Sequence, residues 1–181
     1  LLKELHILTR DGKLNQDSRR KLKQVYHLTQ FIEPLIQSIF DQHGKLCLVD
    51  HGAGKSYLGF ILNDLVCKLQ KQPYEIIGVE IRPELVEKSK DLAHRLGFDC
   101  MNFVLASAKE SLHHPDIPKT VDLVTALHAC NTATDDAIQF ALEKKAQHIV
   151  LVPCCQAEVA SVLRSQKNQT RHLSLAEMWR H

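Results

Sequence analysis

Residues 46–57 read LCLVDHGAGKSY, a short apolar run that passes through an acid into a glycine-rich turn. The apolar part, 46–50, has the length of a buried strand, and residues 56–69 carry the apolar spacing of a helix. A strand that leads through a glycine turn into a helix is typical of a doubly wound α/β sheet. In such a turn the glycine backbone and the start of the helix can approach a ligand closely.

Four further runs of the same kind follow along the chain. They are apolar and rich in β-branched residues, and they cover 75–80, 101–105, 121–127 and 148–152. Helical patterns lie at 83–96 and 135–145, and another is expected from about residue 157. Five buried strands that alternate with helices predict an α/β fold, with a doubly wound, mostly parallel, Rossmann-like sheet and helices on both faces.

A separate helical segment precedes the first strand. From 17 to 43 apolar residues recur at spacings of three and four, namely Leu22, Val25, Tyr26, Ile32, Leu35, Ile36 and Ile39. Pro34 predicts a kink or two abutting helices, because proline removes a backbone donor. Gly44 ends the segment. The sequence therefore divides into an N-terminal helical extension, 1–44, and a domain over 45–181.

Composition narrows the class of protein. The 181 residues are 44% hydrophobic and 24% charged, which is typical of one folded domain and excludes a mainly disordered chain. No apolar run approaches the roughly 20 residues of a membrane span, and the charged start predicts no signal peptide. The six cysteines include no CxxC pair, so we expect reduced thiols and a cytoplasmic protein.

Spacing separates the cofactors that the turn could hold. For a phosphate-binding P-loop the first glycine would fall on Val49, although Gly54-Lys55-Ser56 supplies its end. For a dinucleotide fingerprint the third glycine would fall on Tyr57. The pattern that fits is an acid followed by small residues at alternating positions: Asp50, Gly52, Gly54 and Ser56.

A second acid ends the second predicted strand. Glu80 is followed by Ile81, and a carboxylate at this place can accept hydrogen bonds from both ribose hydroxyls of an adenosine. A surface acid at a strand end is the alternative. Together with Asp50, Glu80 predicts one adenosyl site at the carboxyl edge of the sheet.

Two later loops should open at the same edge. Residues 127–136 follow the fourth predicted strand and include His128, a candidate general base or a buried structural histidine. The other loop holds Cys154 and Cys155, which could be nucleophilic, bind metal or simply pack. Because these two cysteines are adjacent, they lack the spacing of a closed zinc site, and we predict no metal.

Three motifs in order, DHGAGKSYLGFIL (50–62), ALHACNTATDDAI (126–138) and IVLVPCCQAE (149–158), resemble a branch of the class I S-adenosylmethionine (SAM)-dependent methyltransferases. This branch includes a eukaryotic tRNA ribose methylase and methyltransferase-like proteins. The resemblance implies SAM as cofactor, with contacts from Asp50, Gly52, Gly54 and Glu80. We also expect contacts from residues beside these or at the ends of the other strands, namely His51, Ala53, Lys55, Ile81, Ser107, Ala108 and Leu127. The resemblance implies a substrate side at Cys130, Asn131, Cys154 and Gln156. Ser107 stands where many relatives have an acid that reads the adenine.

The resemblance predicts methyl transfer from SAM, and RNA is the leading acceptor. The clue to RNA is a basic N-terminal stretch, with Arg10, Lys13, Arg19, Arg20, Lys21 and Lys23 within 10–24. A protein or small-molecule acceptor, a methyltransferase-fold binding module without activity, and a nucleotide-binding kinase or NTPase are the alternatives. The family usually has seven strands, so the five found here predict a chain that lacks its last strands.

Overall fold

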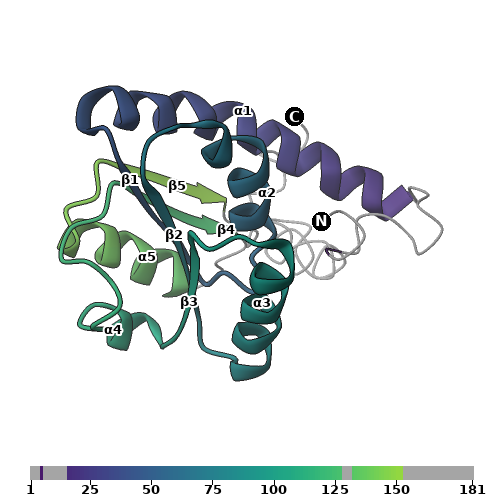
Figure 1. Ribbon diagram of the computed structural model, residues 1–181. Helices are drawn as coiled ribbons and strands as arrows, with labels where there is room; N and C mark the ends of the chain where they lie inside the picture. Colours follow the sequence, from purple (N-terminus) through teal and green to yellow (C-terminus); the bar gives the residue numbers. More distant parts are fainter. Residues whose placement is uncertain (1–4, 6–15, 128–131, 153–181) are drawn as a thin grey trace, which may run out of the picture.

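The computed structural model describes Leu5 and residues 16–127 and 132–152 (Figure 1). The described strands form one parallel sheet in the order β3-β2-β1-β4-β5. These strands are β1 (Leu46–His51), β2 (Tyr74–Glu80), β3 (Met101–Leu105), β4 (Leu123–Leu127) and β5 (His148–Val152). The helices are α1 (Gln16–His43), α2 (Tyr57–Leu65), α3 (Pro83–Leu96), α4 (Ala108–Ser111) and α5 (Thr132–Glu143), with a 3-10 turn η1 (Cys67–Leu69).

Two apolar layers cover the two faces of the sheet. On one face, side chains of α1, α2 and α3 pack against alternate residues of the strands, among them Leu48 and Ile76. On the other face, Phe140 and Ala141 of α5 pack against Val49 and Val124. The predicted doubly wound α/β fold is therefore confirmed, because burial on both faces is what the continuous apolar strands require.

Helix α2 is shorter than the pattern predicted. The helix expected over 56–69 ends at Leu65, and η1 follows after Val66, whose backbone (φ −120°, ψ −65°) is not helical. Helix α4 was not expected at all. It begins at a capping box, in which the Ser107 side chain accepts from the Glu110 backbone and the Glu110 side chain accepts from the Ser107 backbone. The helix predicted from about 157 lies outside the described residues.

Helix α1 runs unbroken from Gln16 to His43 with Pro34 inside it, so the prediction of two abutting helices is wrong. A proline removes one helical hydrogen bond, and the other bonds and the buried face maintain the helix. Tyr26 was expected on the apolar face but is 61% exposed, whereas Ile32 and Ile36 are fully buried.

The N-terminal half of α1 extends beyond the sheet. A helix of 28 residues is about 42 Å long, and the six-residue strand β1 is about 20 Å long. Since α1 ends just before β1 begins, its N-terminal half must project past the carboxyl ends of the strands. Figure 1 shows this projection on the side toward which the β4 and β5 arrows point. In the described ranges no helix is long and apolar enough to cross a membrane.

Candidate functional site

The candidate site lies where the strand order reverses. From β1 the chain moves outward through β2 to β3, and it then returns to place β4 and β5 on the other side of β1. In sheets of this kind the carboxyl ends of the strands beside the reversal leave a crevice for a ligand. The glycine turn after β1 lies at this carboxyl edge of the sheet, beside the reversal.

The turn folds over the end of β2. The backbone N–H of Ala53 donates to the carbonyl of Val79 at 2.9 Å, and the N–H of Ser56 donates to the carbonyl of Ala53 at 2.7 Å. Gly52 and Gly54 have φ values of 69° and 59°, a backbone conformation that side chains rarely allow. A Cβ atom at Gly52 would meet nothing within 4 Å, so the turn presents bare backbone to open space.

Glu80 links this turn to the tip of β2. Its side-chain Oε2 accepts the backbone N–H of Gly54 at 2.7 Å, and Oε1 accepts the N–H groups of Ile81 and Arg82, each at 3.1 Å. Burial, with 6% exposed, would raise the pKa of Glu80. The bonds from Arg82 and Gly54 outweigh it and hold the pKa below its ordinary value. Glu80 is therefore an ionised acceptor at the crevice.

Asp50 and His51 are the last two residues of β1, and both are buried. Asp50 is 3% exposed and accepts a hydrogen bond from Thr125 Oγ1 at 2.7 Å, and burial raises its pKa to about 6. The His51 ring lies 5.1 Å from the Phe140 ring, and burial lowers its pKa against a weaker opposite effect of Asp136. Within the described residues its Nε2 has no hydrogen-bond partner. The side chains of both residues are therefore buried, Asp50 against β4 and His51 against α5.

Two exposed apolar side chains stand beside Glu80. Ile81 is 64% exposed and Leu105 is 51% exposed, and the sheet register places Leu105 opposite Glu80. Ser107, which stands where many relatives have an adenine-reading acid, donates its hydroxyl to Glu110 at 2.6 Å and caps α4. Ala108 begins that helix. The crevice wall near β3 is thus apolar, and the Ser107 hydroxyl is already engaged.

The end of the turn does not resemble a working P-loop. A P-loop serine coordinates magnesium, but Ser56 is fully buried and its hydroxyl has no partner within the described residues. A Cβ atom at Gly59 would lie 2.7 Å from that hydroxyl, so the serine packs against α2. Lys55 is exposed beside it. This burial disfavours the kinase or NTPase alternative.

Several predicted residues cannot be placed. His128, Cys130, Asn131, Cys154 and Gln156 lie outside the described residues, whereas Leu127 is the half-buried last residue of β4. Sequence reasoning missed Arg82 and Leu105 as site residues. The signal for Leu105 was its place at the end of a predicted strand level with Glu80. No signal pointed to Arg82 beyond its position two residues after an acid.

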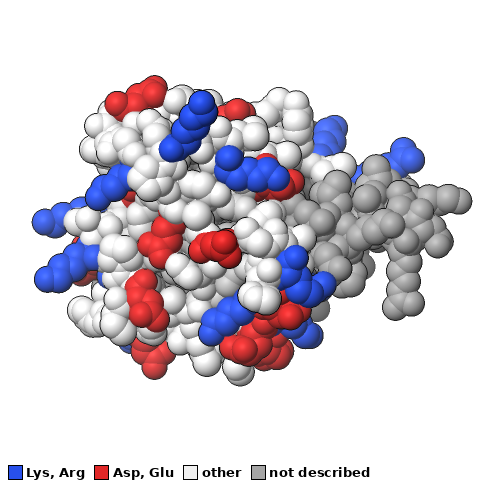
Figure 2. Space-filling model, in the orientation of Figure 1, with Lys and Arg blue, Asp and Glu red and all other residues white. Residues whose placement is uncertain are grey.

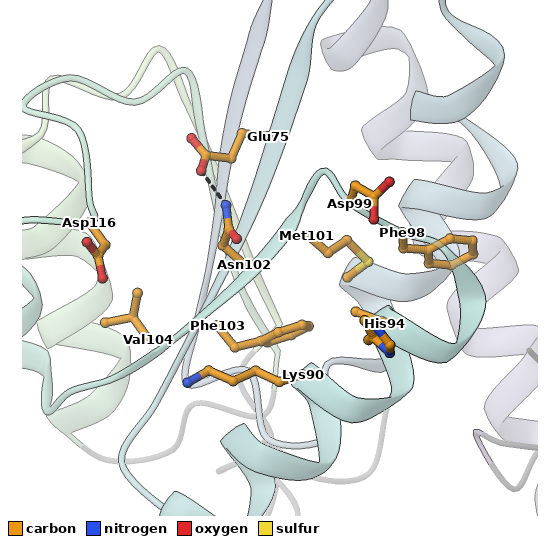
Figure 3. A pocket seen from close by; sticks show the side chains of 11 residues that line it. Glu75, Lys90, His94, Phe98, Asp99, Met101, Asn102, Phe103, Val104 and Asp116 are labelled. Carbon is orange, nitrogen blue, oxygen red and sulfur yellow. Dashed lines mark hydrogen bonds between the residues drawn. The ribbon is translucent and has the colours of Figure 1, made fainter.

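A separate groove lies elsewhere on the molecule. A groove of about 660 Å³ follows the outer side of β3, with lining side chains from α3 and from both faces of the strand, and Figure 3 shows Phe103 on one face and Val104 on the other. No residue predicted for the cofactor lines it. In the described part of the chain, no group of three or more His, Cys, Asp or Glu residues could hold a metal ion.

Several solved structures are similar to this chain, and the match to WbdD shows a shared fold. WbdD, in its complex with a kinase inhibitor, matches with a TM-score of 0.52 at 16% identity, over 69% of this chain and 29% of that one. Precorrin-6y C5,15-methyltransferase from Geobacter metallireducens matches with a TM-score of 0.49 at 20% identity, over 68% of this chain and 63% of that one. YcgJ from Bacillus subtilis matches with a TM-score of 0.47 at 20% identity, over 66% of this chain and 49% of that one. This chain spans less than two thirds of each.

Sequence comparison gives the family. No curated protein matches the chain. A family model described as a methyltransferase domain matches residues 20–162, which include α1 from its second turn and every described strand. The match also spans the glycine turn and Glu80, which are joined by the hydrogen bond from Gly54. The chain belongs to the methyltransferase-domain family.

Proposed function

We propose that the protein is a SAM-dependent methyltransferase. The observation that carries this proposal is the ionised Glu80 at the tip of β2, held by the backbone of the glycine turn at 2.7 Å. A carboxylate so placed accepts hydrogen bonds from a ribose diol. Ile81 and Leu105 offer apolar surface for a flat base, and the bare turn at Gly52 leaves room for the rest of the cofactor. The residues present therefore fit an adenosyl group.

Methyl transfer requires the protein mainly to position the acceptor against the methyl group. The bound sulfonium supplies a methyl group that is already activated, so the chain has to align an acceptor behind it and exclude water. If the acceptor is a hydroxyl, a base must take its proton, and His128 after β4 is our candidate. Cys130, Asn131, Cys154 and Gln156 are proposed for the substrate side because they follow β4 and β5, whose ends lie at the same edge.

Ligand binding by Glu80 variants tests the cofactor. We expect S-adenosylhomocysteine (SAH) and SAM to raise the melting temperature, and Glu80→Ala to weaken SAH binding roughly 10- to 100-fold, the usual worth of hydrogen bonds to a charged group. Glu80→Gln keeps the shape if alanine unfolds the protein. Glu87→Ala, on the exposed side of α3, is the matched control. Stabilisation by ATP alone, or by no adenosyl ligand, would refute the proposal and leave a nucleotide-binding protein or an inactive binding module.

We further propose RNA as the acceptor. The projecting half of α1 supports this, because Arg19, Arg20 and Lys23 are exposed there, on the side of the sheet where the cofactor crevice opens. Figure 2 shows only Lys and Arg coloured at the upper right, over the start of α1, whereas both signs mix over the rest of that face. Exposed His27 and Phe31 are in edge-to-face contact at 4.9 Å between ring centroids, which adds surface for base stacking.

Charge reversal tests the acceptor. Arg20→Glu with Lys23→Glu should weaken binding to single-stranded RNA and lower the salt slope of log K by about 0.7 for each lost phosphate contact. Lys71→Glu, at the amino edge of the sheet before β2, is the control and should change neither value. Transfer of labelled methyl from SAM to a protein fraction, with none to RNA, would instead favour a protein acceptor.

We also propose a cytoplasmic location. Its support is the reduced state of the described cysteines, Cys47, Cys67 and Cys100, which form no disulfide with one another. Mass measurement after thiol alkylation under non-reducing conditions tests this proposal, and alkylation of all six cysteines is expected.

A further inference from the structure

Arg82 binds the carboxylate that the proposed cofactor needs. Its Nε donates to Glu80 Oε1 at 2.8 Å, and its Nη2 donates to Glu80 Oε2 at 3.2 Å, so the guanidinium bridges both oxygens. The same Nη2 lies 3.7 Å from the position that a Cβ atom at Gly54 would occupy. The guanidinium therefore reaches from the tip of β2 across to the glycine turn.

Both oxygens of the Glu80 carboxylate are already fully hydrogen-bonded within the protein, so no lone pair is free for a further donor. Oε1 accepts from the backbone N–H groups of Ile81 and Arg82 and from Arg82 Nε, and Oε2 accepts from the Gly54 N–H and from Arg82 Nη2. A carboxylate offers about four lone-pair directions, and five donors already point at this one. A ribose diol would add two more, so at least one present donor has to leave.

The donor that leaves is the Arg82 side chain. Three of the five donors are backbone N–H groups fixed by the turn and by the start of α3, and they cannot move without refolding both. The Arg82 side chain is 58% exposed, while the Glu80 side chain is 7% exposed. A guanidinium that swings into water keeps its hydration, so its release is the least costly way to make room.

We propose that Arg82 competes with the ribose hydroxyls for Glu80 and so sets the affinity for the cofactor. This inference rests on the proposed function, because it takes an adenosyl group as the ligand. Arg82 lowers affinity by the free energy of the ion pair that has to break. It also pre-orients Glu80 and keeps the carboxylate ionised in the absence of ligand. Only ligands with a hydroxyl pair that can replace both guanidinium bonds overcome this competition.

Binding of SAH and of a matched analogue to variants of the whole chain tests this role. We expect Arg82→Gln to bind SAH up to about fivefold more tightly than the wild type, the upper end of what a partly exposed ion pair contributes. The 2′,3′-dideoxy analogue of SAH has no diol, so its affinity should not gain from the substitution. Arg95→Gln removes another arginine–carboxylate pair from α3, at 2.9 Å from Asp91, and should leave both affinities unchanged.

The outcomes separate the two proposals. If the wild type binds SAH and Arg82→Gln binds it equally or more weakly, the competition is refuted and the proposed function stands. An equal gain for the dideoxy analogue also refutes it, since the effect would then not involve the ribose. If wild type, Arg82→Gln and Arg95→Gln are all folded and none binds SAH, both proposals fail. Arg82→Lys, which keeps the charge without the two-pronged geometry, should bind SAH with intermediate affinity.

Discussion

Asp50 is a buried carboxylic acid whose ionisation at neutral pH destabilises the folded state. It is buried at the end of β1, and burial raises its pKa to about 6 from a reference value of 3.8, while the hydrogen bond from Thr125 offsets only part of that effect. Between these two values the folded state holds a proton that the unfolded state has lost. The unfolding free energy therefore falls as pH rises from about 4 to about 6, because protons are released on unfolding.

Asp50→Asn should remove this fall of the unfolding free energy with rising pH. Asparagine keeps a side-chain oxygen for Thr125 and cannot ionise, so at pH 7 the variant should be more stable than the wild type by up to about 3 kcal/mol. Near pH 4 the two should be equal. Urea unfolding from pH 4 to pH 8 measures this. Glu80, whose pKa is lowered, titrates below its usual range in both proteins and cancels in the comparison. Parallel stability curves would contradict the prediction.

For single residues, the sequence indicated which ones lie at the same edge of the sheet, but not how each side chain is bonded. Asp50, Gly54 and Glu80 lie at one edge, as the strand and turn pattern indicated. The burial of His51 against Phe140 was not visible, because a residue at a strand end can face the crevice or the neighbouring helix. Nor was the pairing of Arg82 with Glu80, since it depends on side-chain conformation.

Helix α2 begins at a strained and tightly packed serine. Ser56 has φ 51°, in the left-handed region, and its buried hydroxyl makes no hydrogen bond within the described residues. A side chain in that region costs about 1 kcal/mol relative to glycine. The hydroxyl also occupies the space next to Gly59, where a Cβ atom would lie only 2.7 Å away. Ser56 and Gly59 are therefore coupled.

A double-mutant cycle should reveal this coupling. Gly59→Ala alone should destabilise the protein by about 1–2 kcal/mol, because the new methyl meets the Ser56 hydroxyl. In a Ser56→Gly background the same change should be neutral or stabilising by up to about 1 kcal/mol, since alanine favours the helix and its remaining contacts, at 3.4 and 3.5 Å, are ordinary. Chemical denaturation of the four proteins measures the cycle, and additive effects would refute the coupling.

Helix boundaries were predictable where a local signal exists. Pro83 and Gly97 bounded α3 correctly, because both residues act on the backbone itself. The sequence also contains the signal for the start of α4, a capping box in which Ser107 is followed three residues later by Glu110, although no helix was predicted there. The end of α2 at Val66 has no such signal. A valine there is compatible with a helix, so tertiary packing decides the break.

The whole molecule uses α1 in two different ways. Its C-terminal half packs Ile36, Ile39 and Phe40 into the core of the sheet, each at most 1% exposed. Tyr26 and Phe31, each 61% exposed, lie on the outer face of the helix, whereas Leu22, Val25 and Leu28 of the projecting half pack, partly buried, against the same core. The pattern of apolar spacing indicated one amphipathic helix but not the point where the sheet ends beneath it. That point follows from the difference in length between helix and strand.

This difference predicts that substitutions on the buried face of α1 change the stability of the protein, whereas substitutions on its exposed face change RNA binding. Ile36→Ala should lower the unfolding free energy by about 2–4 kcal/mol, since it opens a cavity in the core, and should leave RNA affinity of the folded protein unchanged. Phe31→Ala should change stability by less than about 0.5 kcal/mol, because its ring lies mostly in water. It should weaken RNA binding by the roughly 1–3 kcal/mol of a lost stacking contact. Denaturant titration and RNA-binding isotherms on both variants give the four values. A large stability loss in Phe31→Ala would mean that the Phe31 ring packs against the rest of the chain, and unchanged RNA affinity would remove this aromatic side chain from the acceptor site.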